Sequence, residues 1–112
     1  MGLDSIAVAL ADAAFAPGTK RNMVSWVSSP NRVSITGRLR GSNKKGIVVA
    51  VRDGNNIRMS VHAPSNITCA TVCPEVNVNE HLVMQFARNA LDDIRTRQIP
   101  RQISFLRRPD RK

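Results

Sequence analysis

The chain contains few aromatic residues and few cysteines. Its 112 residues include no tyrosine, one tryptophan, three phenylalanines and two cysteines. RNA-binding modules that stack bases on sheet aromatics therefore fit poorly, because each stacked base needs an aromatic side chain. A secreted domain framed by disulfides would usually carry more cysteine.

Long hydrophobic runs and acidic residues are also scarce. No window of about 18 residues is apolar and free of charge, so we expect no membrane span. Leu3–Phe15 is alanine-rich but contains two aspartates and lacks a basic leader, so we expect no secretory signal and folding in a reducing cytoplasm. Seventeen Lys and Arg against eight Asp and Glu give a net charge of +9. This charge favours an anionic partner, nucleic acid first and an anionic membrane surface second.

Three runs between residues 32 and 62 carry the most information. Arg32–Arg40, Gly46–Arg52 and Asn56–His62 alternate, at least in part, between apolar and polar residues. Alternation places successive side chains on opposite faces of a strand. Turns rich in glycine and asparagine separate the runs, so the sequence predicts an antiparallel meander.

One parity of this meander is basic. Cations between positions 30 and 62 are Arg32, Arg38, Arg40, Lys44, Lys45, Arg52 and Arg58, and nearby donors are Ser34, Thr36, Ser60 and Asn66. Such a face would neutralise phosphates, and its hydroxyls would donate to phosphates or base edges. The alternative is an ordinary solvated sheet face. The facing of 46–52 stays ambiguous, because Val48 and Ala50 share the parity of Arg52.

The segments before and after the meander predict further elements. Ile6, Val8 and Leu10 alternate with alanine, which favours a strand, although alanine itself favours a helix. Pro17–Gly18 is a turn signal, and Met23–Val27 would return as the second arm of an N-terminal hairpin within 1–30. Residues 31–78 would form the sheet, with Pro74 at an edge or bulge in an extended Ile67–Val78.

The period changes to helical at Asn79, a plausible N-cap. An apolar stripe follows, made of Leu82, Val83, Phe86, Ala87, Ala90, Leu91 and Ile94. Ile99–Pro100 is expected to end this helix, and a short second helix with Ile103 and Leu106 would follow. Residues 79–108 are thus helical and 109–112 a basic tail.

This order predicts a single α+β domain over 1–112, in which helices cover one sheet face. One narrow stripe is little cover for five or more strands, so a second subunit is expected to complete the core. Trp26 and Phe86 are expected to be core residues.

Cysteine and histidine give no standard site. Cys69 and Cys73 lie four residues apart, about 13 Å in an extended strand, too far for a mutual disulfide. They would either bond to cysteines of a neighbouring chain or be half-buried thiols. A zinc site that adds His62 and His81 matches no common spacing, so no metal or other cofactor is expected.

Catalysis has no support in the sequence, and we expect the protein not to be an enzyme. There is no nucleophile in a known context and no glycine-rich phosphate loop. Asp92 and Asp93 are read as helix-surface charges that pair with Arg95 and Arg97.

Several of these features together resemble one family. Trp26-Val-Ser-Ser-Pro-Asn-Arg-Val-Ser34, the meander with a basic face, Cys-x-x-x-Cys and the terminal helices resemble the coat proteins of the leviviruses, small single-stranded RNA bacteriophages. The likeness runs from about Met23 to Leu106 and rests on order and pattern rather than on a diagnostic motif.

The resemblance implies an N-terminal hairpin, a five-stranded antiparallel sheet and two C-terminal helices that cover the partner's sheet in an interlocked homodimer. Dimers would assemble into an icosahedral shell around the genome, in virions made in a bacterial cytoplasm. The sheet face would also bind an RNA stem-loop as a translational repressor. Residues that would contact RNA are Arg32, Ser34, Thr36, Arg38, Arg52, Arg58, Ser60 and Asn66, and Cys69 and Cys73 would join neighbouring dimers by disulfides.

Two departures from the family pattern concern the repressor role. The region around the cysteines is short, and there is no tyrosine to stack on a loop base. The alternative function is a small cellular RNA-binding or ribosome-associated protein that does not self-assemble.

Overall fold

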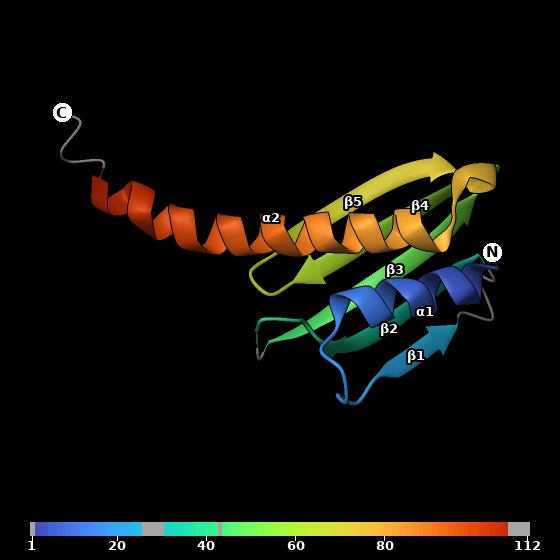
Figure 1. Cartoon of the computed structure of the whole chain (residues 1–112), viewed down its shortest axis with the longest axis horizontal. Coiled ribbons are helices and arrows are strands. Elements are labelled where there is room, and N and C mark those ends of the chain that lie inside the picture. The colour runs from blue at the N-terminus through green and yellow to red at the C-terminus, as the bar shows by residue number, and fades with distance from the viewer. Residues whose placement is uncertain (1, 26–30, 43, 108–112) are drawn as a thin grey trace.

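The computed structural model describes residues 2–25, 31–42 and 44–107. Figure 1 shows a sheet with two helices on one of its faces. The elements in chain order are α1 (Leu3–Ala14), β1 (Asn22–Ser25), β2 (Arg32–Arg38), β3 (Lys45–Asp53), β4 (Asn56–Ala63), β5 (Ile67–Pro74), a 3₁₀ turn (Glu75–Asn77) and α2 (Glu80–Arg107).

The five strands form one sheet in the order β1-β2-β3-β4-β5, and every neighbouring pair is antiparallel. Left-handed backbone at the turns makes the tight connections: Gly54 has φ +61° between β3 and β4, and Ser65 and Asn66 have φ 71° and 62° between β4 and β5. The predicted α+β class and antiparallel meander are confirmed, as is the edge position of Pro74. The expected extended segment Ile67–Val78 is too long, because β5 ends at Pro74 and a 3₁₀ turn follows.

The core lies between the sheet and the two helices. α1 packs against β2 and β3, α2 packs against β4 and β5, and the helices lie side by side and run in the same direction (Figure 1). Fully buried side chains come from all three parts: Ile6, Leu10 and Phe15 at α1, Val33, Val48, Ile57, Met59 and Val61 in the sheet, and Val83 in α2.

The expected strand at Ile6–Leu10 is wrong, because this segment lies within α1. The buried residues of α1 are Leu3, Ile6, Ala7, Leu10, Ala11 and Ala14, a spacing of three and four, whereas Val8 is 42% exposed. Alanine contributes to both the high helix propensity and the buried stripe, and it outweighs the short alternation. The N-terminal hairpin is therefore absent, and β1 pairs with β2 instead.

The same helix changes the argument about cover. The shortage that suggested a second subunit arose from counting α2 alone, whereas α1 supplies cover over β2 and β3 from within the chain. Phe86 is half-buried and packs against the core, as expected. Trp26, the first residue of the quoted segment Trp26–Ser34, lies outside the described residues.

α2 begins as predicted and ends later than predicted. The Asn79 Oδ1 accepts a hydrogen bond from the Leu82 backbone N–H at 2.8 Å, which confirms the N-cap. The expected break at Ile99–Pro100 is wrong, because one helix continues to Arg107 in place of two. Proline has a φ compatible with a helix, so a helix can continue through it, although it removes one i to i−4 hydrogen bond and its ring crowds the carbonyl of residue i−4. The C-terminal part of α2 extends well past the sheet (Figure 1).

Candidate nucleic-acid interface

Strand register decides which side chains face away from the helices. Val48 pairs with Ile35 on β2 and with Val61 on β4, and all three are buried beneath the helices. Ile47, Val49 and Val51 consequently lie on the opposite side. This resolves the ambiguous strand: β3 is apolar on both of its faces.

We call the side away from the helices the open face. Its strand residues with described side chains are Asn22 on β1, Arg32, Ser34, Thr36 and Arg38 on β2, Lys45, Ile47, Val49, Val51 and Asp53 on β3, Asn56, Arg58, Ser60 and His62 on β4, and Thr68, Ala70, Val72 and Pro74 on β5. Neither helix covers this face. Ile47 is 40% exposed and Val72 is 54% exposed, so apolar side chains lie among the polar ones.

Cations lie toward both ends of the open face. Arg38 stands directly opposite Lys45, and Arg32 and Arg58 stand on either side of Val51 in one cross-strand row. The two rows between them contain four hydroxyls and the imidazole of His62, together with three apolar side chains. Among the acidic residues that the structure describes, Asp53 alone lies on the open face. The net charge of the open face is therefore strongly positive.

Six of the eight predicted RNA-contacting residues come together here: Arg32, Ser34, Thr36, Arg38, Arg58 and Ser60. Arg52 does not, and its expected placement is wrong. It pairs with the buried Ile57 on the helix side, and its guanidinium donates to both carboxylate oxygens of Glu75 at 3.2 and 3.1 Å. Asn66 is exposed in the β4–β5 turn, at the end of the sheet rather than on its face.

His62 lies at the centre of a polar chain that the sequence prediction did not include among the site residues. Its Nε2 is 2.9 Å from Ser60 Oγ, and its Nδ1 is 3.2 Å from Thr68 Oγ1. Burial, and then the nearby positive charge of Arg32, lower the pKa of His62 below its ordinary value. The signal that could have identified it is its parity, which it shares with Arg58 and Ser60.

A hollow of about 300 Å³ adjoins His62 at one end of the open face. Its lining is Thr36, Lys45, Gly46, Ile47, His62, Ala63 and Pro64, an apolar surface with a cation, a hydroxyl and an imidazole. Strands β2, β3 and β4 all contribute to it.

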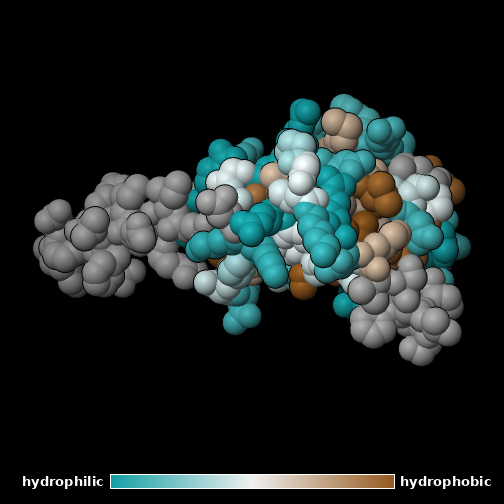
Figure 2. Space-filling view, turned by 90° about the horizontal axis from the view of Figure 1, so that it is seen from below, coloured by the Kyte–Doolittle hydropathy of each residue, from teal (hydrophilic) through white to brown (hydrophobic). Residues whose placement is uncertain are grey.

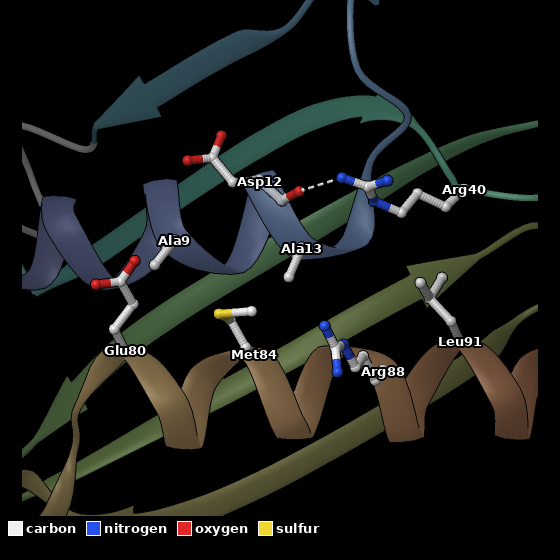
Figure 3. A pocket seen from close by; sticks show the side chains of 8 residues that line it. All are labelled: Ala9, Asp12, Ala13, Arg40, Glu80, Met84, Arg88 and Leu91. Carbon is white, nitrogen blue, oxygen red and sulfur yellow. Dashed lines mark hydrogen bonds between the residues drawn. The ribbon is translucent and has the colours of Figure 1, made fainter.

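The helix side carries a different charge pattern. A groove of about 310 Å³ runs between α1 and α2, lined by Ala9, Asp12, Ala13, Arg40, Glu80, Met84, Arg88 and Leu91 (Figure 3). Arg40 Nη2 donates to the backbone oxygen of Asp12 at 3.0 Å, and the Asp12 carboxylate pairs with Arg21. Acidic and basic groups balance in this groove.

Seen from the β1 side, the molecule shows mostly hydrophilic atoms with hydrophobic ones between them (Figure 2).

Both cysteines lie on the helix side of β5, where they are half-buried and free. Cys69 Sγ donates to Asp93 Oδ2 at 3.0 Å, and Asp93 also pairs with Arg97 at 2.9 Å, as predicted for that helix pair. Burial first, and then Asp93, raise the pKa of Cys69 to about 11.

This arrangement favours packing thiols, because the thiol proton is retained and α2 lies over Cys69. A disulfide to a neighbouring chain stays a prediction. The four candidate zinc ligands are not brought together, since His62 lies on the open face and the two cysteines lie on the helix side.

No protein-family model, curated protein or solved structure matches the chain. Within the described residues, no helix is long and apolar enough to cross a membrane. Function must therefore be inferred from the sequence and the geometry of the two faces.

Proposed function

We propose that this protein is a capsid subunit, a coat protein that dimerises and assembles into an icosahedral shell around single-stranded RNA. In this proposal the open face is turned toward the RNA, and the protein has no catalytic role. The observation that carries it is the one-sided charge of the sheet. Arg32, Arg38, Lys45 and Arg58 share a face with Asp53, the one carboxylate there among the described residues, while both helices lie on the other side.

The chemistry of that face suits a phosphodiester backbone better than base recognition. Guanidinium and ammonium groups attract phosphates at any sequence, and hydroxyls such as those of Ser34 and Thr36 donate to phosphate oxygens. Exposed apolar groups, Ile47 and Val72, offer contact area for sugars and bases. A shell that encloses a whole genome needs such sequence-tolerant contacts from every subunit.

Two features support assembly with other copies. The C-terminal part of α2 extends past its own sheet (Figure 1). The sequence of this part has Ile99, Ile103 and Leu106 at helical spacing. This part of α2 is therefore available to pack against another molecule. At the far edge of the sheet, β5 pairs with β4 and with no other strand that the structure describes. Such an edge strand is suited to pairing with another chain.

The N-terminal third departs from the expected coat-protein plan, since α1 replaces the hairpin. The proposal therefore depends on the open face and on α2. Binding of a specific stem-loop as a translational repressor is a narrower form of the same proposal, and the alternative remains an RNA-binding protein that does not self-assemble.

Assembly is tested by expressing the chain in bacteria and measuring its size by gel filtration with light scattering, absorbance and electron microscopy. We expect megadalton particles that contain RNA. A stable monomer free of nucleic acid would contradict the proposal. RNA-bound monomers or dimers at every concentration would instead support the alternative.

RNA contact is tested by reversing charge on one face at a time. The double variant Arg38→Glu with Arg58→Glu should weaken binding to a single-stranded RNA at least about tenfold. It should also reduce the slope of log K against log salt concentration by the amount expected for about two phosphate contacts. The matched control is Arg88→Glu with Arg95→Glu, which changes the net charge by the same amount. Both of these arginines are exposed and lie on α2, away from the open face.

The control should retain most of the affinity. Equal losses in the two double variants would show that net charge alone matters, and would remove the open face as the binding surface.

A further inference from the structure

His62 uses both of its ring nitrogens within the open face. Ser60 Oγ lies at one and Thr68 Oγ1 at the other, so the imidazole is held between β4 and β5 by two hydroxyls. Thr68 is exposed, His62 is half-buried and Ser60 is 7% exposed. These two hydrogen bonds therefore connect a buried hydroxyl to an exposed hydroxyl through a titratable ring.

Counting protons shows what this arrangement does. A neutral imidazole donates from one nitrogen and accepts at the other. One of the two hydroxyls must therefore donate its hydrogen bond to the unprotonated ring nitrogen. A protonated imidazole donates from both nitrogens, and neither hydroxyl proton is then needed there. Protonation of His62 thus adds one positive charge and also releases one O–H donor.

The charges around the ring oppose that protonation when no anion is bound. The charged groups of the open face are Arg32 and Arg38 on β2, Lys45 and Asp53 on β3 and Arg58 on β4, while β5 contributes only Thr68, Ala70, Val72 and Pro74. Four of these five groups are cations. A phosphate placed against the ring would reverse the balance.

We propose that His62, Thr68 and Ser60 form a phosphate-binding site on the positively charged open face, and that its affinity depends on protonation of His62. The ligand is a phosphodiester group of the bound polyanion, which accepts hydrogen bonds from the released hydroxyl. This inference rests on the proposed RNA-binding function of the open face, and it adds His62 and Thr68 to the contact residues.

The sign of the effect follows from linkage. A bound phosphate stabilises the imidazolium, so the pKa of His62 is higher in the complex than in the free protein. RNA affinity is then constant above the pKa of the complex, rises as the pH falls through it, and levels off below the pKa of the free protein. A difference of one pKa unit corresponds to a tenfold change in affinity.

The first experiment measures binding of an oligouridylate at constant ionic strength between about pH 7.5 and 5.5. Uridine does not titrate in this range, and histidine is the side-chain type whose reference pKa lies there. Wild type should bind roughly threefold to tenfold more tightly at the lower pH. His62→Gln should bind with little pH dependence, and Thr68→Val should show a reduced dependence.

The matched control is His81→Gln, because His81 is exposed on α2 and away from the open face. It should keep the wild-type pH profile. An unchanged profile in His62→Gln would overturn the inference while leaving RNA binding intact. No binding by any variant at any pH would overturn the proposed function as well.

A second measurement needs no substitution. Deuterium exchange at the imidazole C2 position, read by mass spectrometry, gives the pKa of each histidine separately, even in large particles. RNA should raise the pKa of His62. Equal pKa values for His62 with and without RNA would overturn the inference.

Discussion

The two faces of the sheet are built from the same strands but have opposite surroundings. Beneath the helices, Val48, Met59 and Val61 are fully buried. On the open face, their sequence neighbours Ile47, Ser60 and His62 range from 40% exposed to almost buried without any helix above them.

The comparison separates two requirements. The helix side specifies the fold, because close packing there leaves little tolerance for changes in volume. The open face contributes charge and hydroxyls that the fold does not need for its own core. The following predictions test this separation, from the largest expected effect to the smallest.

The largest contrast is expected between Phe15 and Val72. Phe15 is fully buried at the end of α1, so Phe15→Ala should lower the free energy of unfolding by about 3–5 kcal/mol. Val72 is 54% exposed on the open face, and Val72→Ala should change it by less than about 0.5 kcal/mol. Denaturant unfolding of both variants gives the comparison. Similar losses of unfolding free energy in the two variants would mean that Val72 is buried in solution and that the open face is covered there.

The next effect concerns the close approach of Phe15 to β2. A Cβ added at Gly37 would lie 2.6 Å from Phe15 Cδ2, so Gly37→Ala should destabilise the fold by about 1–3 kcal/mol. The loss should shrink in a Phe15→Leu background, where the ring is absent. A loss of the same size in both backgrounds would rule out the ring as its cause.

Two arginines near opposite surfaces of the sheet should behave differently. Arg58→Gln should weaken RNA binding and reduce the salt slope by about one contact. Arg52→Gln should leave RNA binding close to wild type and cost at most about 1 kcal/mol of stability, because its pair with Glu75 is half-exposed. Salt titrations of RNA binding and unfolding curves measure the two effects. Stronger RNA loss in Arg52→Gln would reverse the assignment of faces.

The smallest effect is a pH dependence from Cys69. Its pKa of about 11 lies above the value of 9.0 for an ordinary thiol, so the fold favours the protonated form. The contribution to stability is complete below pH 9 and is lost as the pH rises through about 11. Unfolding measured across this range should show wild type losing stability relative to Cys69→Ser, which keeps a donor to Asp93. Parallel curves would contradict the coupling.

Sequence patterns predicted the strands and the start of α2 well, because both depend on short-range signals. Turn residues set the hairpins, and Asn79 caps the helix through a hydrogen bond to a residue three positions away. The N-terminal segment was misread because Ile6, Val8 and Leu10 satisfy a strand pattern, while the helical stripe is made partly of alanines, which carry a weak hydrophobic signal.

The candidate site was predicted in part for a similar reason. Arg32, Arg38 and Arg58 lie in strands with clear alternation, so their parity gave their face. Arg52 lies in a strand that is apolar on both sides, and only pairing with β2 and β4 shows that it faces the helices.

The sequence by itself determined a positively charged α+β domain with an antiparallel meander, one basic parity and a capped C-terminal helix. These properties follow from composition and from interactions between residues close in the chain. Tertiary structure alone decided that α1 covers the sheet, that β3 directs Arg52 to the helix side, and that His62 meets Thr68 across two strands. The first depends on packing between segments far apart in sequence. The other two depend on strand register, which the local sequence pattern does not determine.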